Sequence, residues 1–320
     1  MYAEAVIRPE VSVVLPTFNR LQYLRRAVDS VFAQTFTDWE LIVADDGSEG
    51  ETATFVAALA NAPKVKVLRL AHTGNPGGVR NAAWRAARGE YIAFLDSDDI
   101  WLPEKLTLQV ASLRSHPQRG WSHTAYALID ESGELLTGSR ARWWPAVEGR
   151  ILERWIALEI SIAVPSVIVR RRLLEQLGGF DANLRMCEDY DLFLRLAAVS
   201  EIDGVRETLT HVRKHREHYR NDAIVFEDRG RALEKFLAAS TDPALRPMLR
   251  KERAKTAAGL ARSQAIDGSR WAALRTLATS SAYSWGFREW WLGGARAAAH
   301  AVTPPGVLRV ARAVVGRGRG

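Results

Sequence analysis

Short apolar runs alternate with segments of helical periodicity over the first 116 residues. Runs rich in apolar and β-branched residues predict buried strands at Val11–Leu15, Glu40–Ala44, Val65–Leu70 and Tyr91–Leu95. Apolar residues at helical spacing predict helices at Leu21–Gln34, Glu51–Ala60, Gly77–Arg88 and, after Pro103, Leu106–His116. Apolar strands that alternate with helices predict an α/β fold, with a mainly parallel sheet covered by helices on both faces.

Acidic side chains follow two of these predicted strands. Asp45 and Asp46 come directly after the second strand, and Asp96, Asp98 and Asp99 follow the fourth. Because the carboxyl ends of parallel strands lie along one edge of an open sheet, where ligands bind, we expect these carboxylates to lie close together. Either cluster alone is explained by a turn or a helix cap, but two clusters at one edge favour a functional site.

Further polar residues reach the same edge. Thr17, Asn19 and Arg20 follow the first strand, and Arg80 opens the helix before the fourth strand and approaches from the far side. Neighbouring carboxylates repel one another unless a cation compensates their charge. An Asp-x-Asp pair offers hard oxygen ligands, which suit Mg²⁺ or Mn²⁺ and leave positions for phosphate oxygens. The edge therefore predicts a metal-dependent site for a nucleotide diphosphate.

Glycine motifs that bind phosphate through backbone amides are missing from the sequence. There is no G-x-x-x-x-G-K-[ST] segment and no G-x-G-x-x-G after a strand, and residues 74–78 match neither pattern. A kinase or an ATPase would be expected to carry such a loop. The metal, rather than backbone amides, would then hold the diphosphate.

Three segments that carry these residues resemble the family 2 glycosyltransferases of GT-A fold. They are Val11–Arg20, Glu40–Ser48 and Gly89–Pro103, and their order and spacing match the family. The later segments Pro165–Arg170, Gly178–Asp181 and Cys187–Arg195 are similar to the second half of the same domain. The resemblance covers roughly residues 10–220. It implies an inverting enzyme that uses a nucleotide-diphospho-sugar.

The resemblance also implies roles for individual residues. Pro16, Thr17 and Asp45 or Asp46 would hold the base and ribose, Asp96 would lie nearer the ribose, and Asp98 would bind the metal. Between Asn75 and Arg80 the chain is shorter than the commonest family version, which bears on the diphosphate contact of Arg80. The residues expected to bind the nucleotide-sugar are Pro16, Thr17, Asn19, Arg20, Asp45, Asp46, Arg80 and Asp96.

Glu188 and Asp189 precede an apolar helical segment. A carboxylate at the start of a helix is stabilised in its ionised form, as a general base requires before it accepts a proton. The same location is explained equally well by a charge that stabilises its own helix. The family resemblance assigns Asp189, in the Glu-Asp motif, to removal of the proton from the acceptor hydroxyl.

Three histidines, His211, His215 and His218, have a spacing that would place them on one face of a helix. Residues 208–212 also read as a strand, which would separate the imidazoles. We rank solvated or packing histidines first and a diphosphate or metal contact by His215 second. A zinc site ranks last, because no cysteine lies nearby.

Composition separates a neutral body from a basic tail. Residues 270–320 contain eight arginines, one acid (Glu289) and four of the eleven tryptophans, and the rest of the chain is neutral. No charge-free window is long enough to span a membrane, and the N-terminus lacks a signal-peptide pattern. With a single cysteine, Cys187, we expect a soluble cytoplasmic protein. We expect a GT-A domain at 1–220 and a helical, basic region at 221–320.

The tail predicts short amphipathic helices. We expect helices at 222–239, 243–265, 271–283, 287–302 and 307–315, and Phe287, Trp290, Trp291, Gly294 and Ala298 fall near one stripe. Arginine with tryptophan on such helices suits the headgroup layer of an anionic membrane. We therefore expect peripheral attachment to the inner face of the membrane. The alternative, that these helices pack on the catalytic domain with solvated arginines, has nearly equal weight.

The sequence thus predicts an inverting glycosyltransferase with a UDP-linked donor and a glycan or lipid-linked acceptor. The alternative is a non-catalytic nucleotide-sugar-binding protein of the same fold. A nucleic-acid partner is not expected, because the neutral body has no positive stripe. A nucleotidyltransferase would carry a glycine-rich start that this chain lacks. Specificity is expected from Trp101, Trp121, Trp143 and Trp144 and from the tail, and the oligomeric state is undetermined.

Overall fold

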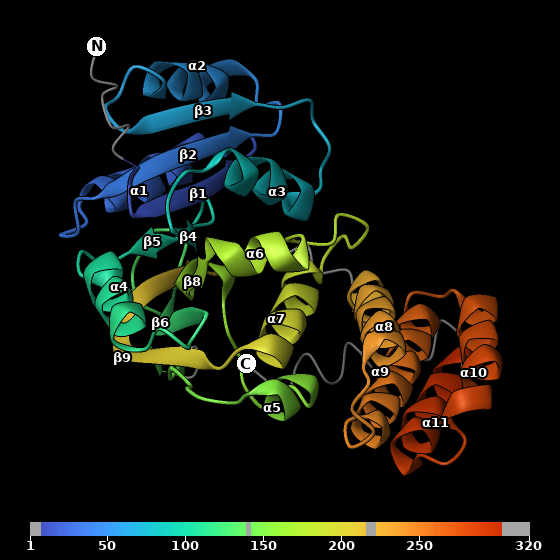
Figure 1. Cartoon of the computed structure of the whole chain (residues 1–320). Helices are drawn as coiled ribbons and strands as arrows, with labels where there is room; N and C mark the ends of the chain where they lie inside the picture. The colour runs from blue at the N-terminus through green and yellow to red at the C-terminus, as the bar shows by residue number, and fades with distance from the viewer. Residues whose placement is uncertain (1–7, 139–141, 216–221, 303–320) are drawn as a thin grey trace. The chain divides into compact units, whose positions relative to one another are not determined.

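The computed structural model describes residues 8–138, 142–215 and 222–302 (Figure 1). The chain divides into two compact units. The first is Met1–Leu184 with Leu192–His218, and the second is Arg185–Asp191 with Tyr219–Gly320. The short segment Arg185–Asp191 thus groups with the C-terminal unit, although the sequence placed it inside 1–220. The boundary between independent domains at residue 220 stays a prediction.

The described part of the first unit contains one nine-stranded sheet (Figure 1). Its strands are β1 (Val11–Thr17), β2 (Trp39–Asp45), β3 (Val65–Arg69), β4 (Tyr91–Phe94), β5 (Ile100–Trp101), β6 (Trp121–Ile129), β7 (Trp143–Trp144), β8 (Val167–Arg170) and β9 (Ile202–Arg213). Their order is β3-β2-β1-β4-β8-β6-β9-β5, with β7 paired to β6. β3, β2, β1 and β4 are parallel, as predicted, and β6 is parallel to β9. β8 is antiparallel to β4 and β6, and β5 is antiparallel to β9.

Helices pack on this sheet in the first unit. They are α1 (Leu21–Phe32), α2 (Gly50–Leu59), α3 (Pro76–Ala86), α4 (Lys105–Ser115), α5 (Leu152–Ile156), α6 (Arg171–Leu177) and α7 (Glu188–Val199), whose first four residues belong to the second unit. Alternate residues of β1, namely Val11, Val13 and Leu15, join the apolar core formed with α1, α2 and α4. α3 packs on β1 and β2. This packing leaves the carboxyl ends of β1, β2 and β4 to carry polar loops.

Several sequence expectations are corrected by the first unit. His211 lies in β9, which confirms the strand reading of residues 208–212 and excludes the helical one, and His218 lies outside the described residues. Trp101 and Trp121 are buried in the core and cannot offer a ring face to a ligand. Trp101 is instead fixed there by a bond from its Nε1 to the carbonyl of Pro165 at 2.7 Å.

Helices make up the second unit over residues 222–302. They are α8 (Asp222–Ala239), α9 (Arg246–Ile266), α10 (Arg270–Ser284) and α11 (Arg288–Val302), and α9 contacts the other three. Small residues let them approach closely: a Cβ on Gly293 would lie 2.6 Å from the Cβ of Ala258. The buried cluster at this contact contains Ala254, Ala258 and Trp290. In the part of the chain that the structure describes, no helix is both long enough and apolar enough to cross a membrane.

Most of the residues expected to form an exposed amphipathic stripe on α11 are not exposed. Trp290 is buried against α9, Gly294 is buried, and Phe287 packs against the same cluster. That stripe is therefore largely the face of the helix that packs on α9 within the second unit, whereas the alternative reading had these helices pack on the catalytic domain. A different face remains exposed and carries Trp291 and Leu292. The expected helix at 307–315 lies outside the described residues.

Candidate active site

A cavity of about 500 Å³ lies at the carboxyl ends of β1, β2 and β4, all within the first unit. Its walls are the loop after β1, the segment between β3 and α3, and the acidic loop after β4. The lining residues are Pro16, Thr17, Phe18, Arg20, Asp46, His72, Gly74, Asn75, Pro76, Val79, Arg80, Asp96, Ser97 and Asp98. Seven of them are residues that the sequence singled out, so the structure brings most of the predicted set together at one sheet edge.

Asp98 lies between two groups that can carry positive charge. Its Oδ2 accepts a hydrogen bond from Nη1 of Arg20 and lies 2.8 Å from Nε2 of His215. Arg20 directly precedes α1 and His215 follows β9, so segments far apart in the sequence converge on one carboxylate. The ring of Tyr23 packs edge-on against His215, with centroids 5.1 Å apart. The loop thus holds Asp98 at the cavity with its charge compensated.

Asp96, on the same loop, is paired with Arg80. Nη2 of Arg80 lies 2.6 Å from Oδ1 of Asp96, and the arginine side chain is 7% exposed. α3 positions this arginine: Asn75 caps the helix by accepting a bond from the amide of Gly78 at 2.7 Å, and proline follows at the first turn. Arg80 therefore reaches the edge even though the segment before it is short.

Asp46 organises the loop that follows β3. Its carboxylate accepts bonds from the amide and hydroxyl of Thr73, at 2.9 and 3.0 Å, and from the amide of Gly74 at 2.9 Å. Nδ1 of His72 lies 2.9 Å from the backbone carbonyl oxygen of Asp46. Asp45 is fully buried and accepts a bond from the amide of Ser48 at 3.0 Å. Asp46 thus lines the cavity, whereas Asp45 supports the turn beneath it.

Two other predicted edge residues hold loops rather than line the cavity. Asn19, with a positive φ of 49°, accepts a bond from the amide of Glu49 at 2.9 Å. Asp99 is buried and accepts a bond from the amide of Arg213 at 2.7 Å. Burial, and then the charges of Asp98 and Asp96, raise the pKa of Asp99 well above its usual value. Asp99 therefore ties the acidic loop to the end of β9.

Two aromatic side chains in the cavity wall were missed by the sequence reasoning. The rings of Phe18 and His72 stack with centroids 4.0 Å apart and planes 18° apart. Phe18 lies within the Pro-Thr-Phe-Asn segment that follows the first strand, so its position near the cavity could have been predicted from that segment. The position of His72 could not have been predicted from the sequence, because His72 reaches the cavity only through the folding of the loop that is bonded to Asp46. Beside them, the hydroxyl of Thr17 is buried and has no hydrogen-bond partner among the described residues.

The donor set can be tested for a metal. Asp96 and Asp98 both line the cavity and supply hard carboxylate oxygens, which fit Mg²⁺ or Mn²⁺, and His215 touches Asp98. Within residues 8–138, 142–215 and 222–302, no group of three acidic, histidine or cysteine side chains forms a ready cluster for an ion. The remaining ligands would have to be water or phosphate oxygens, as is usual for Mg²⁺.

Glu188 and Asp189 begin α7, as the sequence predicted. They belong to the short segment that groups with the second unit. Asp191, two residues later, is buried and its carboxylate lies 2.7 Å from Nζ of Lys235 in α8. Burial raises the pKa of the neighbouring Cys187 thiol to about 12, helped by nearby acids, so this thiol is protonated at neutral pH.

The known proteins that this chain resembles are glycosyltransferases. The sequence model described as Glycosyl transferase family 2 matches residues 12–178. An uncharacterized glycosyltransferase of Rickettsia conorii is 29% identical over 204 residues, which is 64% of this chain and 33% of that protein. The UDP-Glc:alpha-D-GlcNAc-diphosphoundecaprenol beta-1,3-glucosyltransferase WfgD of Escherichia coli is 37% identical over 103 residues, 32% of this chain and 40% of WfgD. The chain spans about a third of the first relatives that it matches.

Solved structures share the fold. The S. aureus protein TarS, residues 1–349, superposes with a TM-score of 0.65 at 21% identity, over 86% of this chain and 81% of that one. TarS has also been solved with UDP and with UDP-GlcNAc. The mannosyltransferase PcManGT of Pyrobaculum calidifontis, solved with GDP-Man and Mn²⁺, has a TM-score of 0.59 at 18% identity, over 93% of this chain and 86% of that one. These likenesses confirm the predicted GT-A type of α/β fold.

Proposed function

Because this chain belongs to glycosyl transferase family 2, we propose that it is an inverting glycosyltransferase with a nucleotide-diphospho-sugar donor. The observation that carries the proposal is the cavity in which Asp46, Arg80, Asp96 and Asp98 meet at one sheet edge. The donor is UDP-linked and the acceptor is a hydroxyl of a glycan or lipid-linked saccharide. The names of WfgD, which acts from UDP-Glc on a diphosphoundecaprenol-linked sugar, and of TarS, solved with UDP-GlcNAc, support this choice.

The cavity offers different chemistry along its length for such a donor. Phe18 and His72 supply apolar ring surface for a base, and the buried Thr17 hydroxyl has a free hydrogen-bonding position among the described residues. Arg20 and Arg80 supply guanidinium groups that match phosphate oxygens. A volume of about 500 Å³ is within the range of small-molecule sites. The nucleotide would therefore lie with its diphosphate toward the acidic loop.

Asp98 and Asp96 would hold Mg²⁺ or Mn²⁺, with His215 as a further contact. When bound, such an ion stabilises the charge that develops on the leaving nucleoside diphosphate. Arg20 already pairs with the carboxylate of Asp98, and Nε2 of His215 lies 2.8 Å from it. The Mn²⁺ complex of the mannosyltransferase PcManGT supports a divalent ion in this fold.

Asp189 would act as the general base. Its ionised carboxylate takes the proton of the acceptor hydroxyl as the hydroxyl oxygen forms a bond to the anomeric carbon. The bond from that carbon to the diphosphate oxygen breaks at the same time, and the electron pair leaves with the diphosphate. A single displacement inverts the configuration. Glu188, the neighbouring acid at the first turn of α7, would share this polar helix start.

Nucleotide release tests the proposal. Wild-type protein with Mn²⁺ should release UDP from UDP-glucose or UDP-N-acetylglucosamine, slowly when water is the only acceptor. Asp98→Asn should lower turnover by roughly 100-fold or more and weaken donor binding. Asp189→Asn should lower turnover similarly but leave donor binding nearly intact. Asp191→Asn is the matched control, because that acid on the same helix is already paired with Lys235.

The outcomes separate the alternatives. Turnover like that of wild type in Asp189→Asn would remove the assigned base. Donor binding without any release of UDP in the wild-type protein would instead support the non-catalytic nucleotide-sugar-binding protein.

We also propose that the second unit attaches to an anionic membrane surface, which places the enzyme on the inner face. Trp271 and Leu274 of α10 and Trp285, which caps this helix, are exposed on one helical face, with exposed fractions of 85%, 42% and 65%. Trp285 contacts Trp291 of α11 edge-to-face, at 4.5 Å between centroids, so the apolar surface continues onto the next helix. Large exposed apolar areas of this kind mark interaction sites.

Charge around this surface fits an anionic partner. Arg275, Arg288 and Arg296 are exposed on the same two helices. The only acid in the sequence of α10 and α11 is Glu289, and it pairs with Lys251 of α9 at 3.0 Å. Tryptophan and arginine at the headgroup level are typical of interfacial helices, and each arginine contributes about 1 kcal/mol near an anionic surface.

A further inference from the structure

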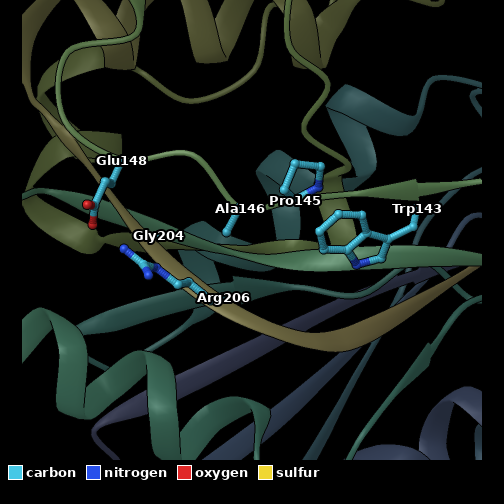
Figure 2. Close-up of a pocket in the computed structure, with 6 residues that line it drawn as sticks. All are labelled: Trp143, Pro145, Ala146, Glu148, Gly204 and Arg206. Atoms are coloured by element: carbon cyan, nitrogen blue, oxygen red, sulfur yellow. The ribbon is translucent and has the colours of Figure 1, made fainter.

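A second cavity, of about 330 Å³, lies on the sheet of the first unit (Figure 2). It is lined by Trp143, Pro145, Ala146, Glu148, Gly204 and Arg206. Gly204 lies nine residues before Arg213 on β9, and the amide of Arg213 donates a hydrogen bond to Asp99 of the acidic loop. The two cavities have no lining residue in common. This cavity is therefore separate from the one at the acidic edge.

Trp143 forms one end of this cavity with Pro145, and Glu148 and Arg206 form the other (Figure 2). Nε1 of Trp143 donates a hydrogen bond to the hydroxyl of Thr208 at 2.8 Å, while 57% of the residue remains exposed. The bond fixes the indole on the sheet and leaves ring surface open. A ring that is already fixed loses little conformational entropy when a ligand packs against it.

The segment that carries the cavity wall is firmly attached to the sheet. Nε2 of the buried His123 lies 2.9 Å from the amide nitrogen and 3.0 Å from the carbonyl oxygen of Val147. A Cβ on Gly204 would lie 2.8 Å from that same carbonyl oxygen, so glycine is needed for the close approach. The neighbouring ring of Trp144 stacks on Tyr126 at 4.7 Å. The cavity is thus a formed feature of the fold.

Arg206 reaches the cavity because of an irregularity in β9. Val205 is opposite Thr124, but the next paired residue is Thr208, so Arg206 and its neighbour form a bulge. Bulges redirect side chains and are frequent near functional sites. Arg206 is exposed and has no hydrogen bond or ion pair within the described residues. The carboxylate of Glu148 provides hydrogen-bond acceptors beside Arg206. Its Oε2 lies 3.8 Å from Nη1 of Arg119.

We propose that this cavity is a saccharide-binding subsite that holds a sugar unit of the acceptor glycan away from the transferred residue. A pyranose presents C–H groups on its ring face and hydroxyls on its edge. The first match the indole of Trp143, and the second match the carboxylate of Glu148 and the guanidinium of Arg206. The assignment to the acceptor rests on the proposed function, whereas saccharide binding does not.

A glycan array of neutral and uronic-acid oligosaccharides tests the subsite without any nucleotide. Wild-type protein should retain members of at least one class, and Trp143→Ala and Arg206→Gln should weaken that retention roughly tenfold. Trp271→Ala is the matched control, because it removes an exposed tryptophan from the second unit. Melting temperatures equal to that of wild type establish that the variants are folded. No retention by wild type, or unchanged retention by Trp143→Ala, overturns the proposal.

UDP release without acceptor separates this inference from the proposed function. Trp143→Ala that releases UDP like wild type but retains no glycan supports the subsite. Wild-type protein that retains glycans through Trp143 but never releases UDP overturns the transferase and leaves the saccharide site in place.

Discussion

The first unit buries most of its tryptophans, with Trp143 an exposed exception, whereas the second leaves three of its four exposed. In the first, Trp101, Trp121 and Phe94 are fully buried. The second packs its helices on alanine and glycine at the α9–α11 contact and leaves Trp271 and Trp285 exposed. Ordinary packing would have buried these rings, because each removes a large apolar area from water. These exposed rings support the proposal that the second unit attaches to a membrane surface.

Both units bury some charged groups, and in the second Arg229 pairs with Glu252 at 3.2 Å. The first buries Lys105 and His123, and burial lowers the pKa of both. Lys105 donates to Gln109 at 2.6 Å and lies over the ring of Trp101. The second unit keeps most arginines of α10 and α11 at the surface. Buried polar groups are tolerated when they are bonded, and exposed arginines keep their charge in water.

The largest expected effect concerns the aromatic surface of the second unit. The triple variant Trp271→Ala, Trp285→Ala and Trp291→Ala should lose co-sedimentation with anionic phosphatidylserine-containing vesicles at low salt. Wild type should bind, through arginines that each contribute about 1 kcal/mol, and its binding should weaken with added salt because ions screen this attraction. Trp143→Ala, an exposed tryptophan of the first unit, is the control and should bind like wild type.

Two results would contradict the membrane proposal. One is wild-type protein that stays in the supernatant with these vesicles, and the other is a triple variant that still binds.

Buried His123 should make stability depend on pH. Burial, opposed by its bond to Val147 and reinforced by Lys105, lowers its pKa to about 4, against about 6.5 in the unfolded chain. Between these values the unfolded state binds the extra proton, so stability is complete above about pH 6.5 and falls as the pH drops toward 4. The full effect is about 3 kcal/mol. Urea unfolding at several pH values should show a shallower pH dependence in His123→Gln, and an unchanged slope would exclude this origin.

Two glycines, one in each unit, should respond to alanine with opposite changes in the free energy of unfolding. A Cβ on Gly89 would lie 2.6 Å from the backbone nitrogen of Ser12, so Gly89→Ala should destabilise the first unit by about 1–3 kcal/mol. In α8, a Cβ on Gly230 would meet only Thr256 at 3.7 Å, so Gly230→Ala should stabilise its helix by up to about 1 kcal/mol. Chemical denaturation of both variants checks this, and a destabilised Gly230→Ala or an unaffected Gly89→Ala would contradict the expectation for that position.

The sequence predicts the parallel half of the sheet well, because its strands are short apolar runs separated by helical patterns. It does not predict the antiparallel pairs of β8, which depend on contacts between distant segments. In the candidate site, the acids and arginines can be predicted from the sequence because they stand in motifs at strand ends. His72 does not, because its place depends on the loop bonded to Asp46. In α11, periodicity identifies an apolar stripe but does not tell whether α9 or a partner covers it.

The central claim is that the acidic cavity binds a nucleotide-sugar together with a divalent ion. The most direct measurement is thermal unfolding with UDP-glucose or UDP-N-acetylglucosamine, with and without Mn²⁺. A ligand present at about 100 times its dissociation constant stabilises the folded protein by about 2.7 kcal/mol, which raises the melting temperature by about 5–10 °C. We expect this rise only when Mn²⁺ is present, and Asp98→Asn should abolish it. No rise with either donor, or an equal rise in Asp98→Asn, would contradict the claim.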